Sequence, residues 1–83
     1  MRVVILPAAE RDVGRLAPEA AERVLRALRT LRDDPRPPGS YLLRNWSPST
    51  WRIRVGAWRV LYRIDDDVAV VTVVRVRHRS SAY

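Results

Sequence analysis

The apolar pattern in the first half of the chain predicts one strand followed by two helices. Residues 3–6 are a short, continuous run of Val, Val, Ile and Leu, which is typical of a strand buried on both faces. Pro7 ends this run and suits the first turn of a helix, so residues 8–16 are read as a short helix. A second helix is predicted from Pro18 to about residue 33, because apolar residues recur there every three or four positions. These residues are Ala21, Val24, Leu28 and Leu31, with Leu25 widening the stripe.

The second half of the chain alternates apolar and polar residues, which predicts an antiparallel sheet. The expected strands are residues 41–44, 51–55, 58–64 and 68–77. Gly56-Ala57 suits a two-residue hairpin turn, and the three aspartates at 65–67 suit a three-residue turn. The order β-α-α-β-β-β-β predicts a single α+β domain over residues 1–83. In it, the two N-terminal helices pack on one face of a small antiparallel β-sheet.

The Gly56–Ala57 turn also predicts which residues of the central hairpin lie opposite each other. Val55 would face Trp58, and Arg54 would face Arg59. One face of the hairpin is then apolar and is assigned to the core: Trp51, Ile53, Val55, Trp58, Val60 and Tyr62. The other face is basic, and extending it through the aspartate turn gives Arg52, Arg54, Arg59, Leu61, Arg63, Val71, Val73, Arg75 and Arg77.

Charge gives this basic face a meaning. All sixteen basic residues are arginine, nine residues are acidic, and the formal net charge is +7. Residues 1–34 carry seven arginines and six acids, whereas residues 41–83 carry eight arginines and three acids. Like charges opposite each other destabilise a sheet, so the pattern predicts a polyanionic ligand. In the alternative, the arginine stems cover Leu61, Val71 and Val73 while their charged heads remain in water.

Other chemistry finds little support in the sequence. The chain has no cysteine, which excludes disulfides and thiolate metal sites. No stretch approaches the roughly 20 apolar residues that span a membrane. We therefore expect a cytoplasmic protein with no cofactor, no bound metal and no contact with a membrane.

Four stretches of the chain form a recognisable series of motifs. They are PAAERDVGRL after the first strand, LRDDPRPPGS at the end of the second helix, WRIRVGAWRVLYRIDDD, and the terminal RHRSSAY. Together they resemble the RelE/ParE superfamily of type II toxin–antitoxin toxins over essentially the whole chain. The basic residues before the terminal tyrosine resemble the RelE branch, the ribosome-dependent mRNA interferases.

The resemblance implies an activity and leaves two alternatives open. RelE toxins are metal-independent endonucleases that cut mRNA in the ribosomal A site through attack by the ribose 2′-hydroxyl. ParE toxins instead inhibit DNA gyrase and have no nuclease activity. In a third reading, the chain is a catalytically weak toxin that acts mainly within an antitoxin complex.

The resemblance also implies catalytic positions. Arg52 and Arg54 match basic residues that hold and activate the phosphodiester, and Arg59 matches an arginine near the scissile phosphate. Arg77 or Arg79 matches a basic residue that stabilises the transition state.

The general base is an open question in this sequence. The resemblance gives Tyr83 the part of an aromatic residue that orients the nucleotide and assists proton transfer. Arginine cannot lose its proton in a protein, so Arg52 and Arg54 cannot act as the base. His78 is a candidate because an imidazole can donate or accept a proton, although on a regular strand it would point away from Arg77.

The partners implied are a cognate antitoxin and mRNA on the ribosome, where contacts with ribosomal RNA are expected. The antitoxin would carry an acidic, partly disordered region that folds as it binds. A toxin–antitoxin hetero-oligomer is the expected assembly.

Overall fold

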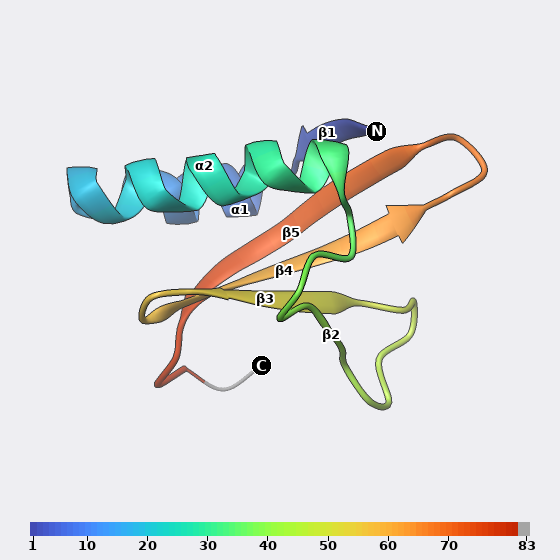
Figure 1. Ribbon diagram of the computed structural model, residues 1–83. Coiled ribbons are helices and arrows are strands. Elements are labelled where there is room, and N and C mark those ends of the chain that lie inside the picture. Colours follow the sequence, from blue (N-terminus) through green and yellow to red (C-terminus); the bar gives the residue numbers. More distant parts are fainter. Residues whose placement is uncertain (82–83) are drawn as a thin grey trace.

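The computed structural model describes residues 1–81 and contains the seven elements in the predicted order (Figure 1). They are β1 (Arg2–Ile5), α1 (Pro7–Gly14), α2 (Pro18–Asp33), β2 (Tyr41–Leu42), β3 (Trp51–Val55), β4 (Trp58–Asp65) and β5 (Val70–His78). Both helices begin at a proline, a residue suited to the first helical turn because it has no N–H to leave unpaired.

The five strands form one sheet in the order β1-β5-β4-β3-β2. Strands β2 to β5 pair antiparallel, as predicted. The first strand adds a parallel pair, with Arg2 opposite Val70 and Ile5 opposite Val73. After β1, the two helices carry the chain across the sheet to the far edge, where β2 lies. The antiparallel strands then follow in order from β2 to β5, and β5 pairs with β1. The α+β fold is confirmed, and the sheet is mixed because of this one strand.

The β3–β4 hairpin has the predicted register. Arg54 lies opposite Arg59, Val55 opposite Trp58, and Gly56 takes a positive φ of 60° in the turn. A positive φ is accessible to glycine at little cost, which is why a glycine suits this turn.

The β4–β5 connection differs from the prediction in two ways. The turn has four residues, 66–69, instead of three, and Val68 lies in it rather than in the strand. The Asp65 carboxylate organises this turn by accepting the backbone N–H of Asp67 at 3.0 Å. Further along, Tyr62 lies opposite Val73 but Leu61 lies opposite Arg75, so Val74 is one extra residue, a β-bulge.

These two differences cancel at the end of β5. The longer turn shifts the alternation by one residue, so Val71 and Val73 are fully buried in the core. Their predicted place on the basic face is wrong. The bulge then shifts the alternation back, so Arg75 and Arg77 lie opposite Leu61 and Arg59 and on the basic face, as predicted.

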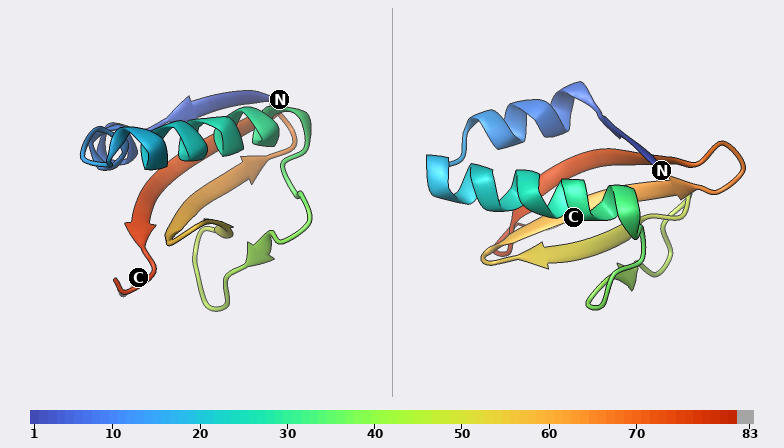
Figure 2. Two further views of the ribbon diagram at one scale, coloured as in Figure 1. Left: turned by 60° about the vertical axis from the view of Figure 1, so that its left-hand side comes forward. Right: turned by 45° about the horizontal axis from the view of Figure 1, so that its top comes forward.

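The two helices lie over one face of the sheet (Figure 2). The core fills the space between the helices and this face. Its buried residues are Ala9, Val24, Leu28, Leu31, Ile53, Val60, Tyr62, Val71, Val73 and Val76. Tyr62 is fully buried, and its hydroxyl donates a hydrogen bond to the Pro35 carbonyl at 2.8 Å. Burial raises the pKa of this phenol to about 12. No helix within residues 1–81 has the length and apolar character needed to cross a membrane.

Candidate functional site

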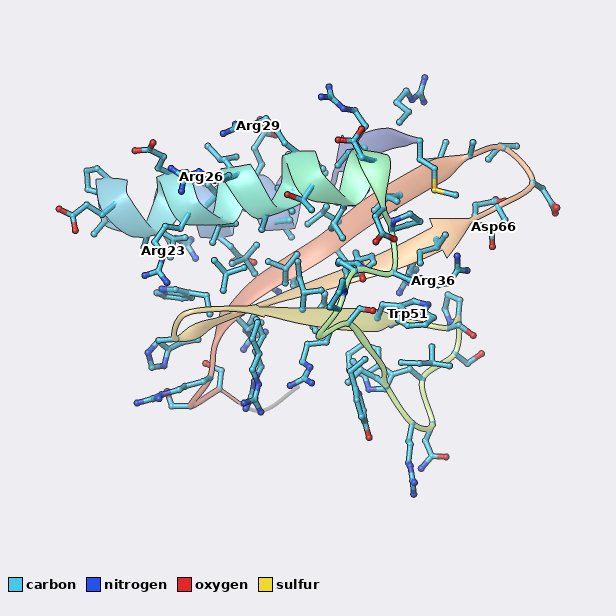
Figure 3. All side chains as sticks on the ribbon, in the orientation of Figure 1. Arg23, Arg26, Arg29, Arg36, Trp51 and Asp66 are labelled. Atoms are coloured by element: carbon cyan, nitrogen blue, oxygen red, sulfur yellow. The ribbon has the colours of Figure 1, made fainter. Side chains whose placement is uncertain are left out.

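Three arginines from three neighbouring strands form a row on the sheet face that the helices leave open. Arg54 of β3 pairs with Arg59 of β4, and Arg59 pairs with Arg77 of β5. Their strand neighbours Ile53, Val60 and Val76 are buried in the core, so the arginines point the other way. Figure 3 shows nitrogen-tipped side chains gathered on this side of the hairpin. We call Arg54, Arg59 and Arg77 the arginine row.

Next to the arginine row, on the same face, a buried leucine lies among further arginines. Leu61 is only 2% exposed although no helix covers its side of the sheet. Arg52 lies opposite Leu61, and its guanidinium stacks over the Tyr41 ring at 5.1 Å from the centroid. The Nε atoms of Arg52 and Arg63 are buried and make no hydrogen bond within the described residues. The arginine stems therefore shield an apolar residue, as one of the two sequence-based readings predicted. The other reading, a polyanionic ligand on this face, stays a prediction.

Arg75 is not available as a free cation on this face. Its Nε and Nη2 donate to the two carboxylate oxygens of Asp12 at 2.8 and 3.1 Å. The backbone N–H of Val76 donates to the same carboxylate at 2.9 Å. Asp12 thereby ties α1 to the part of β5 that extends beyond β1. The predicted place of Arg75 among the free basic residues is corrected, because its charge is neutralised by Asp12.

The surroundings of Asp12 also set its ionisation. Burial acts to raise its pKa, but the hydrogen bonds from Arg75 and from the Val76 N–H outweigh burial, and the pKa lies below its ordinary value. Sequence reasoning missed this residue. The available signal was its spacing, since Asp12 follows the buried Ala9 by three positions and therefore lies on the inward face of α1.

His78 lies on the other side of β5 from the arginine row. It pairs with Trp58, and the two rings meet edge to face with centroids 5.0 Å apart. Its Nδ1 is 2.7 Å from the Ser80 hydroxyl, so the ring holds the segment after β5. The predicted orientation of His78, away from Arg77, is what the strand shows.

The remaining predicted positions lie at the end of the chain. Arg79 is exposed, and its backbone N–H donates to the Ala57 carbonyl at 2.8 Å, which fixes it beside the hairpin turn. Tyr83 lies outside the described residues. Within residues 1–81, no three His, Cys, Asp or Glu side chains are grouped closely enough to hold a metal ion.

This geometry has counterparts among known proteins. A family model described as "ParE toxin of type II toxin-antitoxin system, parDE" matches residues 3–83. Toxin RelG of Mycobacterium tuberculosis (strain ATCC 25618 / H37Rv) is 37% identical over 76 residues, which cover 90% of this chain and 86% of RelG.

Solved structures share the fold. A chain of the toxin–antitoxin complex RelBE2 from Mycobacterium tuberculosis has a TM-score of 0.83 and 33% identity, with 94% of this chain and 96% of that chain covered. A chain of the archaeal RelE–RelB complex from Pyrococcus horikoshii OT3 has a TM-score of 0.84 at 22% identity, covering 98% and 97%. That second likeness shows the fold alone. From the family match and the identity to RelG, the chain belongs to the RelE/ParE superfamily of type II toxin–antitoxin toxins.

Proposed function

We propose that this toxin is a metal-independent mRNA endonuclease that acts in the ribosomal A site. The observation that carries the proposal is the arginine row, with Arg52 beside it, on a sheet face that no helix covers. Guanidinium groups are planar, permanently charged and able to bind phosphate through two hydrogen bonds at once. Such a row suits a chain of phosphodiesters.

The cleavage step needs charge stabilisation and two proton transfers. The ribose 2′-oxygen loses its proton and attacks the adjacent phosphorus, the bond to the 5′-oxygen breaks, and that oxygen gains a proton. A 2′,3′-cyclic phosphate and a free 5′-hydroxyl are left. Fixed cations stabilise the pentacoordinate anion between these states, a contribution of several kcal/mol in comparable sites. Arg59, at the centre of the row, is assigned to the scissile phosphate, while Arg54 and Arg77 hold the flanking oxygens.

Proton acceptance is the weak point of the described face, because an arginine cannot give up its proton in a protein. Tyr62 is unsuitable, since it is buried on the core side with a pKa of about 12. His78 faces the helix side of the sheet and is assigned to holding the chain end. The acceptor is therefore Tyr83, water or a group of the ribosome. In the last case, cleavage would depend on the ribosome.

The cognate antitoxin is the proposed inhibitor. The relatives RelBE2 and the archaeal RelE were each solved as a complex with an antitoxin. An acidic, partly disordered antitoxin segment would neutralise the basic face and form a hetero-oligomer with the toxin. Free toxin in the cytoplasm would then cut mRNA and arrest growth.

Inhibition of DNA gyrase is the second candidate, favoured by the ParE description of the matching family model. The two functions leave different traces in cells. A nuclease yields mRNA fragments that end in cyclic phosphate, whereas a gyrase inhibitor yields stabilised gyrase–DNA complexes and intact transcripts. A catalytically weak toxin would produce neither trace on its own.

Replacement of Arg59 by alanine tests the proposal in a reaction with programmed ribosomes. We expect cleavage to fall by about 10²–10³-fold, because a central stabilising cation is lost. The free energy of unfolding should change by only about 0.5 kcal/mol, since the side chain lies outside the hydrophobic core. Arg11→Ala, an exposed arginine on α1, is the matched control and should change neither quantity. Intact mRNA in cells arrested by the wild-type toxin would reject the nuclease in favour of the gyrase candidate.

A further inference from the structure

A second group of arginines lies beyond the arginine row, where α2 passes over the tip of the β3–β4 hairpin. A cleft of about 370 Å³ separates the two elements, and three arginines line it: Arg23 and Arg26 from α2, and Arg54 from β3. None of the residues that line this cleft, all within the described part of the chain, is acidic. Arg23 projects from α2 toward the hairpin tip (Figure 3).

The hairpin is shaped to receive the Arg23 side chain. A Cβ at Gly56 would lie 3.0 Å from Nη2 of Arg23, so the guanidinium lies directly over the glycine. The positive φ favours a glycine at this point, and the absence of a side chain there leaves room for the guanidinium. Arg26 is held by Glu22 at 3.3 Å, but both side chains are about two-thirds exposed, which leaves the pair weak and easily exchanged for another anion.

The cleft is continuous with the arginine row because Arg54 belongs to both. From Arg77, the cations run through Arg59 to Arg54 across the strands, and then around the hairpin tip to Arg23. Like charges placed side by side repel, and a single polyanion that follows the whole path would relieve all of these contacts together.

We propose that the cleft formed by Arg23, Arg26 and Arg54 is a second phosphate-binding site for RNA, occupied by the continuation of the strand that lies on the arginine row. The proposal rests on the proposed RNA-binding function of the row and extends it from the open face of the sheet to α2. The cleft anchors nucleotides that flank the scissile bond and takes no part in the chemistry.

The lining of the cleft favours a nucleic acid over a protein segment. Among the described residues that line the cleft, the apolar side chains are the small ones of Ala27 and Val55. The groove of about 340 Å³ on the other flank of α2 is also lined by three arginines, but it adds four larger apolar side chains, Val3, Ile5, Leu25 and Leu28. A folding peptide needs such apolar area to offset its ordering entropy, whereas a phosphate backbone needs guanidinium groups.

The test compares two RNA lengths on two matched double variants. The probes are fluorescent oligouridines of about 5 and about 12 nucleotides, methylated at every 2′-oxygen so that they cannot be cleaved. The test variant is Arg23→Gln with Arg26→Gln. The control is Arg2→Gln with Arg29→Gln, which removes the same charge from the other flank of α2. Thermal unfolding of both variants verifies that the fold is retained.

For the longer probe, we expect the test variant to lose about 1.4 from the slope of log affinity against log salt, since two phosphate contacts disappear. Its affinity for the shorter probe should stay within about twofold of wild type, because that probe fits on the arginine row. The control variant should match wild type with both probes.

Each contrary result has a distinct meaning. An unchanged slope with the longer probe overturns the second site, and the proposed function stands if the shorter probe still binds in an Arg59-dependent way. Failure of wild type to bind either probe removes the proposed function and the second site with it. A polyglutamate peptide that binds wild type as tightly as the longer RNA, and loses as much on the test variant, would assign the cleft to an acidic protein instead.

Discussion

The arginines of this protein differ in whether a carboxylate binds them. Arg75 is bound by Asp12 through two hydrogen bonds, and Arg36 donates to Asp66 at 2.9 Å while it lies 5.4 Å from the Trp51 ring centroid. Arg54, by contrast, is exposed and lies opposite another cation, Arg59. The count of arginines in the sequence therefore overstates the charge available to a ligand. Contacts between distant elements decide which cations are left over.

Asp12→Asn should destabilise the fold by roughly 2–4 kcal/mol at neutral pH, because it leaves Arg75 without its carboxylate. The pKa of Asp12 is lower in the folded state than its ordinary value of 3.8. The ionised carboxylate therefore stabilises the fold above about pH 4, and this stability is lost as pH falls toward the folded pKa. Urea unfolding at pH 7 and at about pH 3 should show the difference between wild type and variant shrink in acid.

Asp33→Asn is the matched control, since Asp33 is an exposed acid at the end of α2 and its loss should cost little at either pH. An equal loss of stability from both substitutions would mean that net charge sets the acid sensitivity, and not the contact of Asp12 with Arg75 and Val76 on β5.

His78→Gln tests the assignment of the proton acceptor. The ring contacts Trp58 and Ser80 on the side of β5 away from the arginine row. We expect the variant to keep wild-type cleavage within about threefold and to keep the same pH–rate profile. Cleavage by programmed ribosomes over a range of pH is the measurement. A folded variant that loses cleavage together with one limb of the profile would make His78 the general base.

At the scale of elements, the accuracy of sequence reasoning depended on the turns. The β3–β4 register was predictable because Gly56 and Ala57 are flanked by clean alternation, and a two-residue turn leaves one pairing. The faces of the β5 residues could not be predicted in the same way, because a four-residue turn and the bulge at Val74 each shift the alternation by one residue. The sequence shows neither shift, and their cancellation kept Arg77 on the predicted face while moving Val71 and Val73 into the core.

Deletion of Val74 should therefore disrupt the protein far more than a conservative replacement. Without the bulge, residues after Val73 would change faces, and the arginines of β5 would turn into the core. We expect loss of cooperative unfolding, or destabilisation by about 4 kcal/mol or more. Val74→Thr is the control and should fold, because the half-buried position accepts a β-branched side chain. A stably folded deletion variant would show that the bulge is dispensable.

At the scale of the whole molecule, the sheet separates two tasks. One face supports the helices and holds the core, and the other presents a row of arginines from β3, β4 and β5. Sequence periodicity revealed this division because period-two alternation assigns faces directly. It could not reveal the hydrogen-bonded pair of Asp12 and Arg75, which are 63 positions apart. Nor could it reveal the cleft between α2 and the hairpin, because both features depend on how the helices pack on the sheet.

The charge of the open face should appear as a salt dependence of RNA binding. If Arg52 and the three members of the arginine row each neutralise one phosphate of a short single-stranded RNA, the log–log slope should be about −2.8. Affinity would then fall roughly 50-fold between 50 and 200 mM salt. Fluorescence anisotropy with the non-cleavable oligouridine of about 5 nucleotides measures this slope. Arg59→Ala should reduce it by about 0.7 and Arg11→Ala should not. A slope near zero for wild type would mean that the open face binds something other than a phosphate backbone.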